Sequence, residues 1–377
     1  MNNDSRSDSP ILLTPGPLTT RPEIRRTMLR DWGSRDKAFI ALTAEMRQRL
    51  LAVAQGEDSH AAVPLQGSGT FIVEATIGTL IGPTDKLLVL INGAYGERML
   101  TIAQRLKRCV TLLRWPEDQA IDPARVDHAL ADDPAITHVA VVHCETTTGL
   151  LNPLEALAAV TTHRKRALLV DAMSSFGALP INLRQTAIAA VMASSNKCLE
   201  GVPGLGFALI EKKALEAARG NNASLSLDLH EQCRGFEANG QWRFTPPVQV
   251  VAALVEALRT LENEGGPSAR LRRYQDNFDT LAAGMAAMGF RLYLSPAVQA
   301  PIIATFWQPD AAWFDFASFY DMLATRGFLI YPGKLSHANT FRIGCIGALD
   351  RNDYQRLLVT IGDIKRELET TPVRPRV

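Results

Sequence analysis

Residues 168–175 read Leu-Leu-Val-Asp-Ala-Met-Ser-Ser, and residues 192–197 read Met-Ala-Ser-Ser-Asn-Lys. In each stretch, the end of an apolar run typical of a buried strand is followed by small polar residues. One charged side chain lies at this junction or just beyond it. The carboxylate of Asp171 would be costly to bury without a cationic partner. Lys197 follows the next strand of the same predicted sheet. The two stretches therefore predict a strand edge that carries chemistry.

Short apolar runs alternate with helical patterns on both sides of these stretches. This alternation indicates crossover connections and an α/β fold, with a mainly parallel sheet between helices on both faces. Ligands of such sheets bind beyond the carboxyl ends of the strands. The expected strands are 87–91, 110–113, 139–142, 168–170, 188–192 and 207–210, and the expected helices between them are 71–80, 98–107, 123–131 and 154–164.

The pattern changes beyond about residue 245. Two long helices are expected at 248–264 and 269–288, separated by Gly265-Gly266-Pro267. Shorter strands (302–307, 328–331 and 341–343) and helices (316–325 and 354–368) follow, as in a small α+β domain. We therefore predict an N-terminal arm (1–20), a large domain (21–264) and a small C-terminal domain (265–377).

Composition limits the partners of the chain. With 377 residues, 46% hydrophobic residues and a formal net charge of +1, no global field favours nucleic acid or a membrane surface. The five cysteines are scattered and lack a CxxC pair, which argues against disulfides and a zinc site. The N-terminal residues lack an apolar segment typical of a signal peptide. We expect a soluble, cytoplasmic protein that holds no metal.

Gln66-Gly67-Ser68-Gly69-Thr70 follows a short apolar run and opens an expected helix. The N–H groups at the start of a helix and its dipole favour an anion, so Ser68, Gly69 and Thr70 could hold a phosphate. A tight strand-to-helix turn is the competing interpretation.

The two charged residues each have two interpretations. Asp171 could pair with the pyridinium nitrogen of a cofactor, or cap a helix. Lys197 could be a partly desolvated amine that forms a Schiff base, or an ordinary surface lysine.

Three further side chains suit the same edge of the sheet. Thr147, in His143-Cys144-Glu145-Thr146-Thr147, could contact a cofactor oxygen, and Tyr95 could stack on a flat ring; loop solvation and packing are the alternatives. Arg342 lies in an expected strand, where its guanidinium could bind a carboxylate or phosphonate, or form a structural salt bridge. A catalytic pair of His143 and Glu145 is less favoured than a structural role.

Together these segments resemble the class V, fold type I aminotransferases over nearly the whole chain. The resemblance is carried by Leu12 to Thr20, Leu65 to Gly69, Asn92 to Gly96, Glu145 to Gly149, Asp171 to Gly177, Ser195 to Cys198, Gly201 to Gly204, Ser224 to Leu229, Trp242 to Thr245 and Tyr331 to Lys334. Two residues depart from it, because a serine is expected in place of Cys144 and a glutamine in place of Glu200.

The resemblance implies pyridoxal 5′-phosphate as cofactor and a homodimer with active sites at the interface. Lys197 would bind the cofactor covalently and act as general base. By the same resemblance, Asp171 would pair with the pyridine nitrogen, Tyr95 would stack on the ring, and Thr147 would lie near the phenolic oxygen. The phosphate would be held by Ser68, Gly69 and Thr70, with Thr245 and Trp242 of the other subunit completing its site. The substrate would be bound by Arg342 and by Gly16 of the arm.

The resemblance also implies the reaction, which is ping-pong transfer of an amino group from an aminophosphonate to pyruvate. Alanine–glyoxylate or serine–pyruvate exchange is the alternative within the class. A pyridoxal-phosphate lyase is less favoured, because Cys345 follows a buried strand and lacks an activating base.

Overall fold

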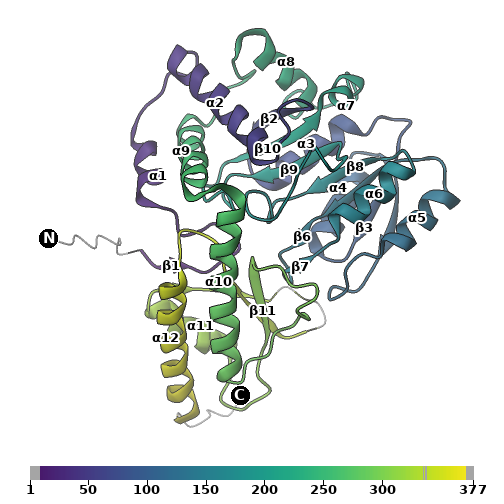
Figure 1. Ribbon diagram of the computed structural model, residues 1–377. Helices are drawn as coiled ribbons and strands as arrows, with labels where there is room; N and C mark the ends of the chain where they lie inside the picture. Colours follow the sequence, from purple (N-terminus) through teal and green to yellow (C-terminus); the bar gives the residue numbers. More distant parts are fainter. Residues whose placement is uncertain (1–8, 334, 336–337, 371–377) are drawn as a thin grey trace.

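The computed structural model describes residues 9–333, 335 and 338–370. The parts of the predicted arm and small domain at 1–8 and 371–377, and Lys334, lie outside the described residues. The described chain is built around a central sheet, with a group of helices and short strands from the C-terminal part beside it (Figure 1).

The central sheet has seven strands in the order β2-β10-β9-β8-β5-β3-β4. Six strands run in the same direction, and β10 alone is antiparallel to both of its neighbours. The predicted α/β class and the mainly parallel sheet are confirmed. The strands are β2 (His60–Gln66), β3 (Lys86–Ile91), β4 (Cys109–Arg114), β5 (Ile136–Val142), β8 (Ala167–Asp171), β9 (Ala190–Ser194) and β10 (Leu205–Glu211).

Helices cover both faces of this sheet, because alternate side chains of the strands are apolar in both directions. One face packs against α2 (Lys37–Val53), α5 (Pro123–Asp132), α6 (Leu154–His163) and α9 (Val248–Glu264). The other packs against α3 (Gly69–Leu80), α4 (Ala94–Arg105), α7 (Lys212–Ala217) and α8 (Leu229–Asn239). Short elements lie between them: α1 (Pro22–Arg26), a 3₁₀ turn (Thr27–Leu29), β6 (Cys144–Glu145) and β7 (Leu150–Leu151).

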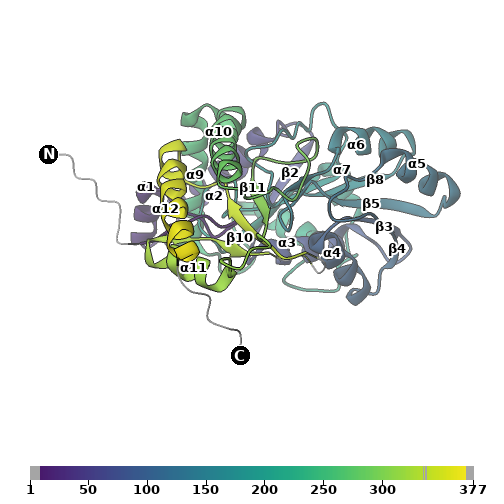
Figure 2. The ribbon, with the colours of Figure 1, turned by 90° about the horizontal axis from the view of Figure 1, so that it is seen from below.

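The C-terminal part has its own apolar core, rich in phenylalanine. Two long helices, α10 (Gly266–Ala287) and α12 (Arg351–Thr370), pack side by side, as both ribbon views show (Figure 2). The other elements are β11 (Ile303–Trp307), α11 (Phe316–Thr325), β12 (Phe328–Leu329), β13 (Tyr331–Pro332) and β14 (Thr340–Gly344), of which β11, β14 and β13 form an antiparallel sheet.

The structure contradicts one strand that we predicted from the sequence. Residues 328–331 were expected to form a single strand, but β12 and β13 belong to different sheets. β12 pairs in parallel with β1 (Ile11–Leu12), so the N-terminal segment is anchored on the C-terminal part of the chain. The exact division into arm and two domains stays a prediction.

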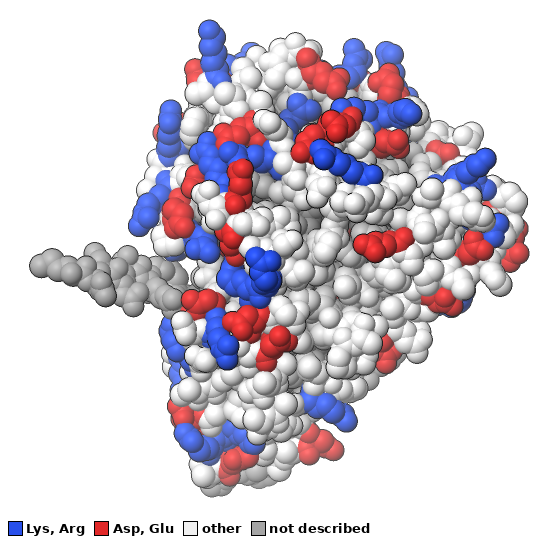
Figure 3. All heavy atoms as spheres, in the orientation of Figure 1, with Lys and Arg blue, Asp and Glu red and all other residues white. Residues whose placement is uncertain are grey.

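Positive and negative side chains are intermingled on the face shown in Figure 3, as expected from a net charge near zero. Within the described residues, no helix combines the length and apolar character needed to cross a bilayer.

Candidate active site

A cavity of about 170 Å³ lies where the strands of the central sheet end, and it contains most of the predicted site residues. The loop between β2 and α3, the start of α4, and the ends of β8 and β9 all contribute to its wall. This is the position expected for a ligand of an open parallel sheet. Predicted residues that line the cavity are Ser68, Gly69, Thr70, Tyr95, Asp171 and Lys197.

The amine of Lys197 is held by the N-terminal arm. Its Nζ donates a hydrogen bond of 2.6 Å to the carbonyl oxygen of Pro15. Burial lowers the pKa of Lys197, and the nearby guanidinium of Arg342 acts in the same direction. A lowered pKa favours the neutral amine, which is the nucleophilic form.

Gly16 allows this approach of the arm. Its φ of +122° lies in a region that residues with a side chain rarely adopt. A Cβ at this position would also lie 2.9 Å from Lys197 Cδ and 2.9 Å from the carbonyl oxygen of Asn196. The arm therefore reaches the predicted lysine because residue 16 has no side chain.

Asp171 is a buried carboxylate without a cationic partner in the described parts of the chain. Its Oδ1 accepts a hydrogen bond of 2.9 Å from the N–H of Met173. Burial raises the pKa of Asp171 to about 6, although the Met173 N–H, Arg98 and Lys197 lower it. The side chain faces the cavity and would gain from a cationic ligand.

Arg98 is a site residue that the sequence analysis missed. Its guanidinium lies 4.8 Å from the centre of the Tyr95 ring, and its Nη1 donates to Thr70 Oγ1 at 3.2 Å. We expected a helix to begin at Arg98, but α4 begins one turn earlier, at Ala94. The earlier start places Tyr95 and Arg98 three residues apart on one helical face, directed into the cavity.

The carboxylate of Glu145 binds backbone N–H groups at the start of α4. This residue is fully buried, and its carboxylate accepts hydrogen bonds from Gly96 N (3.0 Å) and Tyr95 N (3.4 Å). Burial raises its pKa to about 7, against the effect of these two N–H groups. Thr147 donates to the same carboxylate at 3.5 Å. His143 instead lies 3.0 Å from Ser175 Oγ, so the structure does not pair it with Glu145.

Arg342 lies on β14, and only 4% of its surface is exposed. Its Nη1 donates to Thr146 O at 2.9 Å, and its Nε donates to Pro332 O at 3.1 Å. Both partners are neutral carbonyls, and in the described residues no carboxylate pairs with it. The structural salt bridge considered from the sequence is therefore absent there, and the positive charge is available to an anion.

Trp242 and Thr245 lie outside this cavity. They line a separate hollow of about 120 Å³ with Phe71 and Phe244. Trp242 donates from Nε1 to Thr43 Oγ1 at 3.2 Å and packs edge-on against Phe236. Their role in the site of a second subunit stays a prediction.

Comparisons with known proteins agree with this geometry. The family model described as aminotransferase class-V matches residues 25–333. The chain is 52% identical over 97% of its length to 2-aminoethylphosphonate–pyruvate transaminases of Pseudomonas putida and Pseudomonas aeruginosa, of which it covers 100% and 98%.

Solved structures of other aminotransferases superpose over nearly the whole chain. The alanine–glyoxylate aminotransferase of Nostoc matches with a TM-score of 0.89 and 26% identity, covering 97% of this chain and 99% of that one. The ureidoglycine–glyoxylate aminotransferase of Bacillus subtilis matches with a TM-score of 0.88 and 25% identity, covering 98% and 96%. The predicted fold type I architecture is confirmed by these matches. The chain belongs to the class-V aminotransferases, and its cofactor is pyridoxal phosphate.

Proposed function

We propose that the protein transfers the amino group of 2-aminoethylphosphonate to pyruvate, giving phosphonoacetaldehyde and L-alanine. The observation that carries the proposal is 52% identity, over 97% of the chain, to curated transaminases with this activity in their name. The cavity supports it independently, because a buried amine and an unpaired buried carboxylate line one space, and the guanidinium of Arg342 lies near enough to the amine to lower its pKa.

The residues around the cavity fit pyridoxal phosphate. Asp171 supplies the anionic partner that a pyridinium nitrogen needs, and its pKa is raised by burial. The first-turn N–H groups of α3, with Ser68 and Thr70, suit the phosphate. Tyr95 would stack on the ring, and Thr147 would lie near the phenolic oxygen. When bound, the cofactor supplies an electron sink for the substrate carbanion.

Lys197 would hold the cofactor covalently and then move a proton at the substrate carbon. Burial favours the neutral form of its amine, which can accept that proton. The carbonyl of Pro15 stabilises the amine's position beside the cavity. The arm also covers this side of Lys197, which limits access of water to the amine.

Arg342 would bind the acidic group of each substrate in turn, the phosphonate of the donor and the carboxylate of pyruvate. Its hydrogen bonds from Nε and Nη1 to two carbonyl oxygens fix the plane of the guanidinium, and its remaining N–H groups can bind a ligand. Arg98 adds positive charge to the wall of the cavity, near Thr70.

We further propose that the protein acts as a cytoplasmic homodimer. Large apolar side chains are exposed around the hollow that holds Trp242 and Thr245, namely Phe71 (53% exposed), Leu225 (72%) and Phe244 (45%). A second copy that covered this surface would bring Thr245 and Trp242 toward the phosphate loop of its partner. Sedimentation velocity of the wild type and of a Leu225→Lys variant tests this. The variant should dissociate into monomers at a higher protein concentration than the wild type.

The donor is tested by adding single candidates to the cofactor-loaded enzyme and following the absorbance of the cofactor. We expect 2-aminoethylphosphonate to convert it to the pyridoxamine form, and pyruvate to restore the original spectrum. Conversion by alanine or serine with no response to 2-aminoethylphosphonate would instead support alanine–glyoxylate or serine–pyruvate exchange.

A further inference from the structure

Glu200 lies three residues after Lys197 and adopts an unusual backbone conformation. Its φ is +61°, in the left-handed region that costs energy for any residue with a side chain. Its N–H donates to the carbonyl oxygen of Lys197 at 2.8 Å, which closes the turn that carries the lysine. A glycine would form this turn without that cost, so the side chain of Glu200 must contribute enough to offset it.

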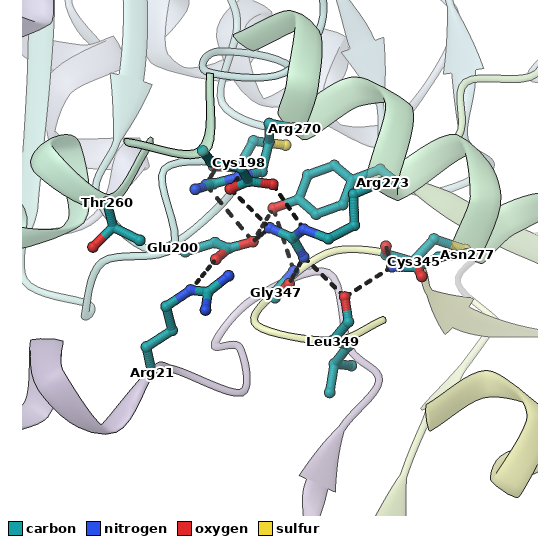
Figure 4. Close-up of polar contacts among 12 residues, drawn as sticks. Arg21, Cys198, Glu200, Thr260, Arg270, Arg273, Asn277, Cys345, Gly347 and Leu349 are labelled. Atoms are coloured by element: carbon teal, nitrogen blue, oxygen red, sulfur yellow. Dashed lines mark hydrogen bonds and ion pairs between the residues drawn. The ribbon is translucent and has the colours of Figure 1, made fainter. Parts of the chain in front are cut away.

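The side chain of Glu200 is the centre of a buried ionic cluster, which we define as Glu200, Arg270, Arg273 and Tyr274 (Figure 4). Its Oε1 accepts hydrogen bonds from Tyr274 Oη at 2.6 Å and from Arg273 Nη2 at 2.7 Å. Arg270 Nη1 lies 3.6 Å from the same oxygen. At the edge of the cluster, Arg21 Nε lies 3.8 Å from Oε2.

The cluster joins two segments that are far apart in the sequence. On one side, Arg270 donates to Cys198 O at 2.7 Å, within the lysine turn. On the other side, Arg273 donates to Gly347 O at 2.6 Å and to Leu349 O at 2.9 Å. These carbonyls belong to the segment that directly follows β14, the strand of Arg342. The lysine turn and the strand of Arg342 are thus fastened to the same helix, α10.

Burial makes the cluster stiff. Arg270 is fully buried, and the carboxylates that pair with it among the residues the structure describes are those of Glu200 and Glu264. Although burial acts against it, the pKa of Arg270 is raised by Tyr274, Glu200 and Glu264. Removing one partner of such a cluster leaves a charge buried without compensation, so its geometry is strongly favoured over alternatives.

We infer that Glu200 is a positioning residue, which sets the separation between the amine of Lys197 and the guanidinium of Arg342 through the buried cluster on α10. A substrate gripped by its acidic group at Arg342 must present its other end to the amine. An error of a fraction of an ångström in that separation therefore lowers the rate although both groups are intact. The inference rests on the roles proposed above for these two residues.

The influence of Glu200 passes through the backbone. Burial is the main cause of the lowered pKa of Lys197, and Arg342 adds to it. Tyr95, Cys198 and Asp171 act in the opposite direction, and Glu200 is not among these groups. Neutralising Glu200 while keeping its shape should therefore leave the lysine turn in place, although it leaves Glu264 as the remaining carboxylate beside Arg270 and so lowers the free energy of unfolding. Glutamine can still accept at Oε1, and no hydrogen-bond donor reaches Oε2 from the described residues.

The test uses three variants of the full-length, cofactor-loaded protein. Glu200→Ala removes the link, Glu200→Gln keeps its hydrogen bonds, and Arg273→Lys keeps the charge but cannot span Glu200 and the carbonyls of Gly347 and Leu349 together. Leu323→Ala, in the apolar core of the C-terminal part, is the control for lost stability alone. All are compared at a temperature at which each is folded.

We expect kcat/KM for 2-aminoethylphosphonate to fall about tenfold or more in Glu200→Ala and Arg273→Lys, and to stay within about threefold of the wild type in Glu200→Gln and Leu323→Ala. Deuterium exchange gives a second readout, on cofactor-free and loaded protein. In Glu200→Ala and Arg273→Lys, the peptides covering 195–201 and 344–349 should both exchange faster than in the wild type, while peptides from α5 should exchange at the wild-type rate.

Wild-type kcat/KM and wild-type exchange in both peptides of Glu200→Ala and Arg273→Lys would overturn the inference. If Glu200→Ala does not fold, Arg273→Lys alone decides it, because its charge is kept and its side chain is partly exposed. A wild type that does not use 2-aminoethylphosphonate would contradict the proposed function instead. The exchange experiment does not depend on that result.

Discussion

Replacing Asp171 by asparagine should stabilise the cofactor-free protein above about pH 6. The carboxylate is buried and has no cationic partner in the described residues, so its ionisation disfavours the folded state. Asparagine has nearly the same shape, and its amide oxygen can still accept the hydrogen bond from Met173 N. The substitution therefore removes the charge and keeps the local packing.

The size of the effect follows from the pKa of Asp171, which burial raises from 3.8 to about 6. A difference of roughly 2 pKa units corresponds to about 3 kcal/mol. Between these two pH values the folded state binds the proton more tightly than the unfolded state. The contribution of Asp171 to the unfolding free energy is thus fully present below pH 3.8 and is lost as the pH rises to about 6.

The assay is urea unfolding of cofactor-free protein from pH 4 to pH 8, followed by the fluorescence of its five tryptophans. The unfolding free energy of the variant minus that of the wild type should rise over this range by about 3 kcal/mol and then level off. Because the charge of Asp171 also raises the pKa of Glu145, removing that charge lowers the pKa of Glu145 and acts in the same direction as the expected rise. A difference that does not change with pH would refute the reasoning.

Asp127→Asn provides a control whose difference should not change over this range. Arg164 holds the pKa of Asp127 below its usual value of 3.8, so this pair contributes its full stability above that value and loses it only as the pH falls through the lowered pKa. The unfolding free energy of this variant minus that of the wild type should therefore be nearly constant from pH 4 to pH 8. A rise as large as that of Asp171→Asn would show that the pH dependence is unrelated to burial.

Three further substitutions test the proposed site. Lys197→Ala should lower turnover by about a thousandfold or more and abolish the covalent attachment of cofactor, which borohydride reduction followed by mass spectrometry measures; retained attachment would exclude this lysine. Arg342→Lys should raise KM for both donor and pyruvate by about tenfold with a smaller change in kcat, because a lysine keeps the charge but loses the fork; steady-state kinetics with an unchanged KM would contradict it. Gly16→Ala should lower kcat/KM by at least about tenfold, because its Cβ would displace the arm from Lys197. A melting temperature near that of the wild type would show that the lower activity is not caused by unfolding.

The fold followed from the sequence wherever a local pattern was sufficient. The expected helix at 248–264 matches α9, and the strands that end near Asp171 and Lys197 belong to one sheet as predicted, where the structure shows them to be neighbours. These elements are determined by apolar periodicity and by helix ends, which are properties of a few neighbouring residues.

The sequence was less informative where long-range contacts decide the structure. The helix was expected to begin at residue 98, but α4 begins at Ala94, where the buried carboxylate of Glu145 compensates free N–H groups of the first turn. That carboxylate comes from β6, 49 residues beyond Gly96 along the chain. The cluster around Glu200 is of the same kind, since Arg273 is 73 residues away and only the departure from the expected glutamine drew attention to it.

The position of β2 at the edge of the central sheet also has a consequence for how the protein folds during synthesis. β2 precedes the loop of Ser68 to Thr70, and among the described strands its only neighbour in the sheet is β10. The ribosome must therefore produce the chain through Glu211 before β2 can form its backbone hydrogen bonds. Until then its unpaired edge is open to other chains, which makes this stretch a point where chaperones would protect the nascent protein.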